Sequence, residues 1–159
     1  MKKINFNIRY NHKIAIFSLS SLFFIYLLYL SIPSLYDTGR VQKVFNEKFL
    51  TDFNLNISLS TDISYRILPQ PHFLIKDAKL FYKKKNLLNE IGHIKELKIY
   101  VSKKNFFKEK NVEILKVELN KSNFFLMKND FIFFKKYLNK KFSEKQITIK
   151  KSKFFLNDD

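Results

Sequence analysis

Cysteine is absent from this chain of 159 residues, and glycine occurs only as Gly39 and Gly92. Without cysteine, a disulfide framework and a cysteine-based metal site are both excluded. Phosphate-binding loops and dinucleotide-binding turns need closely spaced glycines, and the G-x-S-x-G elbow of hydrolases does not occur. The sequence therefore lacks the usual motifs of nucleotide-binding proteins and of serine hydrolases.

Histidine is also scarce, and the three histidines, His12, His72 and His93, are widely separated. A metal site needs several ligands at suitable spacing, and neither H-x-H nor H-E-x-x-H is present. We interpret His72 and His93 as exposed polar residues at strand edges. Because the sequence holds no catalytic constellation, we expect a protein that is not an enzyme, with no cofactor and no catalytic or metal-binding residues.

Arginine accounts for only three of the 30 basic residues, although the formal net charge is +16. Arginine supplies the bidentate geometry that base recognition favours, so we expect no nucleic acid partner. The abundance of lysine, asparagine, isoleucine and phenylalanine instead indicates an AT-rich genome. We interpret the lysine clusters 83–85, 103–104 and 150–151 as solvated surface, with contact to anionic head groups as the alternative.

The longest apolar run is Ile14–Ile32, which contains no charged residue, glycine or proline. As a helix it spans roughly 28 Å, close to the roughly 30 Å hydrocarbon core of a bilayer. Tyr26 and Tyr29 lie near its end, where aromatic rings suit the membrane interface. A cleavable signal peptide is the alternative, but its apolar region is about 7–15 residues long and precedes a small-x-small site. The run therefore favours an uncleaved transmembrane helix over residues 14–32.

The flanks of this run predict its orientation. Residues 1–13 carry four basic residues and no acidic one. Because cytoplasmic flanks are the more basic, we expect a cytoplasmic tail over 1–13 and a periplasmic domain over 33–159. In a bacterium with two membranes, this orientation predicts a protein that crosses the inner membrane once.

The pattern after Pro33 predicts an α+β fold. Val41, Val44, Phe45 and Phe49 recur at helical spacing, which predicts an amphipathic helix over 37–50 whose apolar stripe is core. A second such helix is expected over 130–142. Alternating apolar residues predict a mostly antiparallel, groove-like sheet with strands at 54–60, 63–67, 73–82, 93–102, 112–120, 123–128 and 146–156. A slip of the alternation near residues 76–77 predicts a β-bulge.

An antiparallel sheet needs one apolar face for its own core. If no second layer covers that face, it forms a trough that can hold acyl chains. The sequence leaves open whether these residues are core or the lining of a lipid groove: Ile57, Ile67, Phe73, Ile75, Leu97, Ile99, Val117 and Leu119.

The run ISYRILPQPHFLIKDAKL, residues 63–80, resembles the N-terminal signature of the AsmA family. That pattern is a strand, a Leu-x-Pro-x-Pro break and a second strand with an Asp near its end. Its positions here are Leu68, Pro69, Pro71 and Asp77. The preceding span and helix, and the strands that follow, agree over residues 14–127. Nothing visible covers the edge of the last expected strand, so we expect either a sheet that closes on itself or a piece of a longer protein. AsmA-like proteins are usually several times longer, which agrees with a piece of such a protein.

The resemblance implies an inner-membrane anchor that holds a periplasmic β-groove, with a role in lipid transport between membranes and in outer-membrane assembly. It implies as partners the inner membrane, a phospholipid or other acyl lipid, and other envelope proteins. The alternative is a bitopic envelope adaptor, such as the anchored subunit of a lipopolysaccharide-export bridge or a division scaffold.

Overall fold

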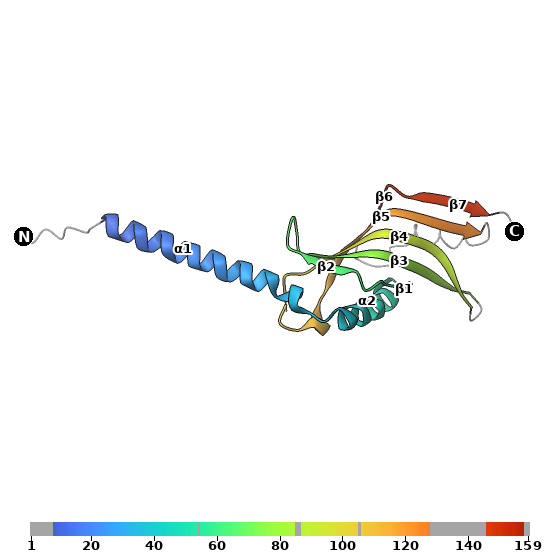
Figure 1. Ribbon diagram of the computed structural model, residues 1–159, viewed down its shortest axis with the longest axis horizontal. Helices are drawn as coiled ribbons and strands as arrows, with labels where there is room; N and C mark the ends of the chain where they lie inside the picture. The colour runs from blue at the N-terminus through green and yellow to red at the C-terminus, as the bar shows by residue number, and fades with distance from the viewer. Residues whose placement is uncertain (1–7, 54, 85–86, 105, 128–145, 158–159) are drawn as a thin grey trace, which may run out of the picture.

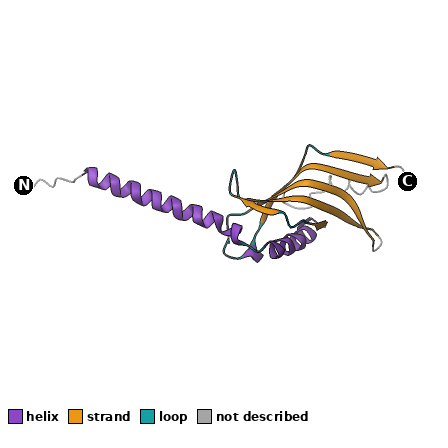
Figure 2. Cartoon of the chain, in the orientation of Figure 1, coloured by secondary structure: helices purple, strands orange, loops and turns teal. Residues whose placement is uncertain are grey.

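The computed structural model describes residues 8–53, 55–84, 87–104, 106–127 and 146–157. A long helix projects from a domain in which one curved sheet carries a shorter helix on one face (Figures 1 and 2). The helical elements are α1 (Ile8–Ser31), a 3₁₀ turn η1 (Ile32–Leu35), α2 (Thr38–Phe53) and a second turn η2 (Glu109–Asn111). The second amphipathic helix expected over 130–142 lies outside the described residues.

The sheet has seven strands: β1 (Asn56–Ser58), β2 (Ile63–Arg66), β3 (His72–Lys84), β4 (Leu87–Val101), β5 (Ile114–Met127), β6 (Gln146–Lys150) and β7 (Lys153–Asn157). Its order is β1-β3-β4-β5-β6, with β2 beside β3 and β7 beside β5. The pairs among β1 to β5 are antiparallel, whereas β6 and β7 run parallel to β5. The predicted α+β class with a mostly antiparallel sheet is confirmed in this form.

Three strand boundaries differ from the prediction. Strand β4 begins at Leu87 rather than at residue 93, and the two strands expected over 112–128 are one continuous strand, β5. The single strand expected over 146–156 is divided into β6 and β7, because the extended conformation is interrupted between Lys150 and Lys153.

The slip of the side-chain alternation near residue 77 is explained by one row of residues that lie at matching positions on neighbouring strands. Asp77, Lys121 and Lys151 have positive φ angles of 55°, 53° and 49°. The pairing of neighbouring residues places Lys95 of β4 in the same row. A positive φ turns the following side chains to the opposite face, so Phe73 and Ala78 share one face despite their odd separation. The predicted bulge is wrong, because no residue is inserted there; the register of β3 and β4 shifts instead between Leu80 and Phe81.

Helix α2 packs on the apolar face of the sheet, near β1 and β3 (Figure 1). The backbone N–H of Arg40 donates to Asp37 Oδ1 at 2.9 Å, which caps the helix. The buried stripe of α2 comprises Val41, Phe45, Phe49 and Phe53. The ring of Phe45 meets Phe73 edge-on at 5.1 Å between centroids. The prediction that the stripe is core is therefore confirmed for Val41, Phe45 and Phe49, whereas Val44 is only partly buried and lies outside the core, and Phe53 takes the fourth buried position.

Candidate functional site

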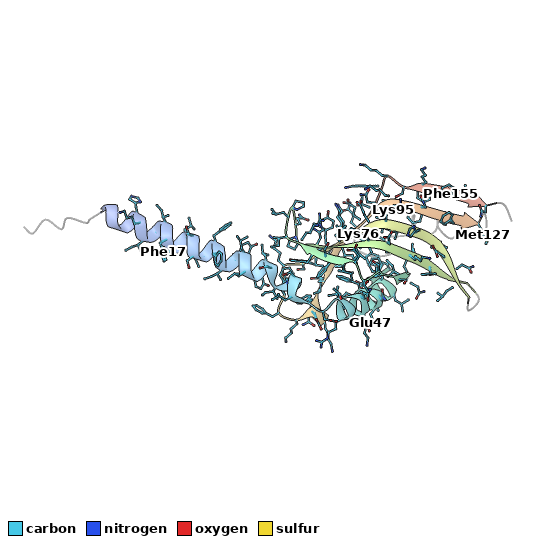
Figure 3. The ribbon with its side chains drawn as sticks, in the orientation of Figure 1. Phe17, Glu47, Lys76, Lys95, Met127 and Phe155 are labelled. Carbon is cyan, nitrogen blue, oxygen red and sulfur yellow. The ribbon has the colours of Figure 1, made fainter. Side chains whose placement is uncertain are left out.

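Helix α1 stands clear of the rest of the chain, as Figure 3 shows at Phe17. The segment His12–Leu35 is long and apolar enough to cross a membrane, a test that a signal sequence also passes. Most large apolar side chains of α1 are exposed, from 36% at Leu27 to 78% at Phe17. An apolar surface of this size is stable in lipid rather than in water. This helix is the first part of the candidate site.

The C-terminal end of α1 is tied to the domain by tyrosines. The hydroxyl of Tyr29 donates to the carbonyl of Lys103 at 2.6 Å, and that of Tyr65 donates to the carbonyl of Leu30 at 2.8 Å. Burial, with a smaller contribution from Tyr36, raises the pKa of Tyr65 well above its usual range. Tyr65 therefore remains a hydrogen-bond donor at physiological pH, and the helix meets the sheet through fixed contacts.

The sheet residues proposed as lining or core lie in the core. Six of them form two adjacent rows across β3, β4 and β5: Phe73, Ile99 and Val117 in one, and Ile75, Leu97 and Leu119 in the other. Ile57 of β1 pairs with Leu80, and Ile67 packs against the core from the end of β2. Apart from Ile67, none of these side chains is more than 7% exposed. These seven side chains are therefore packed inside the domain rather than exposed on its surface.

The same apolar face becomes accessible at the β6–β7 edge. Ile147, Phe154 and Leu156 are 37%, 51% and 62% exposed, although they continue rows that are buried in β5. The ring of Phe154 stacks on buried Phe124 at 4.8 Å. We call Ile147, Phe154 and Leu156 the edge patch. The sequence pattern pointed to Ile147, which alternates with lysines, but not to Phe154 or Leu156, and the exposure of all three depends on their place at the margin of the sheet.

The residues that resemble the AsmA signature lie at and after the connection between β2 and β3. Leu68 is 79% exposed, Pro71 is buried, and the Leu68–Pro69 peptide bond is cis. The carbonyl of Pro71 accepts a hydrogen bond from the backbone N–H of Val101. Pro69 and Pro71 thus separate two strands, as the sequence pattern predicts, while Asp77 lies in the positive-φ row.

The expectation for His72 is wrong. His72 is 3% exposed, its Nδ1 lies 2.7 Å from the carbonyl oxygen of Gln70, and its ring packs on Tyr100. His93 is partly exposed, and its Nε2 lies 3.6 Å from Asp77 Oδ1. Among the described residues, no group of three potential ligands could hold a metal ion.

Charged residues cover the sheet face opposite α2. Glu118 is 5% exposed and accepts a hydrogen bond from Lys150 Nζ at 2.9 Å. Burial alone raises the pKa of Glu118, but that hydrogen bond and the charges of Lys150, Lys98 and Lys116 outweigh it and lower the pKa overall. Lys76 and Lys121 pair with Asp62 and Glu96. Much of the positive charge on this face is therefore compensated locally.

The pairing of Glu118 with Lys150 predicts that the stability of the fold decreases in acid. Because folding lowers the pKa of Glu118, its contribution to stability is complete above the ordinary value of 4.5 and is lost as the pH falls below it. Thermal melts followed by circular dichroism should show that Glu118→Gln lowers Tm at pH 7, and that its difference from wild type shrinks towards about pH 3. Glu113→Gln, at an exposed position, is the control. A difference that stays constant with pH would contradict the assignment.

Comparisons of this chain with protein-family models, with curated proteins and with solved structures found no match.

Proposed function

We propose that this chain is a non-enzymatic, inner-membrane-anchored envelope protein of the AsmA type that takes part in lipid transport between membranes and in outer-membrane assembly. Helix α1 anchors it, the basic tail lies in the cytoplasm, and the sheet domain lies in the periplasm. The residues 63–80 support the AsmA type, because their strand, proline break and second strand follow the order of the family signature.

One observation carries the lipid role: an exposed apolar helix is joined to a sheet whose apolar face is buried near the helix and exposed at the edge patch. A buried methylene contributes roughly 0.8 kcal/mol, so an acyl chain with several methylenes on the patch gains a few kcal/mol before ordering costs. A lysine near an anionic surface adds about 1 kcal/mol, which salt screens. The apolar contact is therefore the stronger and the less salt-sensitive of the two.

A photocrosslinking amino acid at Phe154 tests this role. Phe155 is a matched control, because it is the neighbouring residue, is similarly exposed at 42% against 51%, and faces the other side of the strand. In intact membranes the probe at 154 should form adducts with phospholipid, and the probe at 155 far fewer. The adducts should persist in about 1 M salt, where the Debye length is about 3 Å.

Equal adducts at the two positions, or adducts that salt abolishes, would contradict an apolar lipid site. The buried positions Ile75 and Ile99 are unsuitable for this test, because a polar substitution there disrupts the core before it reports on binding.

The free edge of the sheet favours a second candidate function, that of a bitopic adaptor. Within the described chain, no strand pairs with the outer sides of β6 and β7. An unpaired strand edge can bind an extended segment of another protein. In the same experiment, an adaptor gives protein adducts at position 154 in place of lipid adducts.

A further inference from the structure

Outside α1, the three most exposed large apolar side chains of the described residues come from segments far apart in the sequence. Leu35, Leu68 and Phe107 are 85%, 79% and 78% exposed. They belong to η1, to the β2–β3 connection and to the β4–β5 connection. Figure 1 shows that these segments lie at the same end of the domain, where α1 enters. We call these three side chains the proximal triad.

The contact between Phe107 and α1 shows at which turn of the helix the Phe107 ring lies. This ring lies 5.5 Å from that of Tyr29. Tyr29 is three residues before the end of the apolar run at Ile32, which corresponds to about 4.5 Å along a helix. An apolar groove at this junction is lined by Leu22, Ile25, Tyr26, Leu28, Tyr29, Ile32 and Phe107. Phe107 therefore lies beside a part of α1 that belongs to the membrane-spanning run.

The polar groups around Phe107 suit a membrane interface. Lys103 Nζ donates to the hydroxyl of Tyr26 at 3.2 Å and lies 5.9 Å from the centre of that ring. Lys104 and Lys108 are exposed in the same connection. Tyrosine and lysine at the end of an apolar helix are typical of the head-group level of a bilayer.

We propose that the proximal triad inserts into the outer leaflet of the same bilayer that α1 crosses, so that the domain sits on the membrane surface instead of hanging freely from its anchor. The bilayer is the occupant because Phe107 packs beside Tyr29 in the last turns of α1, and the segments that carry Leu35 and Leu68 lie at the same end of the domain. Three contacts from separate segments, together with the helix, fix the tilt of the sheet relative to the membrane. This inference rests on the proposed membrane anchor.

The chain has no tryptophan, so single tryptophans report without background. Full-length Leu68→Trp and Phe107→Trp proteins are placed in vesicles of phosphatidylcholine and phosphatidylglycerol whose acyl chains are brominated both near the head group and near the chain end. Phe24→Trp in α1 is the reference for membrane insertion. Leu88→Trp is the matched control, because Leu88 is an exposed leucine, at 59%, near the β3–β4 hairpin at the far end of the sheet (Figure 1).

The proposal predicts loss of most of the emission at positions 68 and 107, as at position 24, and little loss at position 88. Quenching at 24 without quenching at 68 and 107 would overturn this inference and leave the anchor intact. Blue-shifted but unquenched emission at 68 and 107 would also overturn it, because protein then covers the triad. Absence of quenching at all four positions would overturn the anchor and, with it, this inference.

Discussion

Phe45→Ala is expected to lower the free energy of unfolding by about 3–5 kcal/mol, the usual cost of removing a buried aromatic ring. Phe45 is 1% exposed and packs edge-on against Phe73, at the centre of the contact between α2 and the sheet. Chemical denaturation of the full chain in detergent, followed by circular dichroism, measures the change. Leu50→Ala is the matched control on the same helix, because Leu50 is 49% exposed and its truncation should cost about 0.5 kcal/mol or less.

Comparison of Phe45→Ala with Leu50→Ala, by denaturation and by lipid crosslinking, also tests whether the apolar face of the sheet is a closed core or an open groove. If α2 were a cover that leaves the sheet easily, Phe45→Ala would cost little more than Leu50→Ala and would increase lipid adducts deep in the sheet. The structure predicts the opposite, a large loss of stability with lipid contact confined to the edge patch. Comparable costs for the two variants would show that α2 is not part of the core.

The second large effect is expected from arginine in α1. Leu19→Arg and Phe23→Arg together place two charges one turn apart near the middle of the apolar run. Each arginine at the centre of a membrane helix costs about 2.5–3.5 kcal/mol on insertion scales. The double variant should therefore be lost from the membrane fraction after alkaline extraction, where the wild-type chain remains.

The control for this experiment is Leu50→Arg with Leu88→Arg, which adds the same charge at exposed leucines of the domain. That pair should leave the chain in the membrane fraction. Retention of the Leu19→Arg/Phe23→Arg variant would contradict a membrane-spanning α1, and loss of the control pair would show that charge alone explains the release.

The length of the apolar run was sufficient to predict α1, and local periodicity was sufficient to predict α2 and the alternation of most strands, because each pattern depends on neighbours a few residues away. The extent of β4 and β5 could not be predicted in this way. Lys121 reverses the side-chain phase without ending β5, and that reversal resembles a break in the sequence. The register shift opposite Leu80 similarly masks the first part of β4.

The accessibility of the site depended on contacts between distant segments. His72 reads as an exposed polar residue, yet Tyr100 of the neighbouring strand covers its ring. Ile75 and Phe154 are both apolar strand residues, but Ile75 lies in the core, whereas Phe154 lies at the sheet margin. Sequence alternation identified the apolar face, and the order of the strands decided which part of that face is exposed.

The topology of the chain is the central claim, and single-cysteine labelling tests it most directly. Because the sequence has no cysteine, Lys3→Cys and Glu113→Cys each introduce one thiol, in the tail and at an exposed position of the domain. In cells with a permeabilised outer membrane, a membrane-impermeant maleimide should label Cys at position 113 at once. It should label position 3 only after the inner membrane is disrupted. Labelling of position 3 in intact cells with protection of position 113, or recovery of the chain in the soluble fraction, would contradict the account.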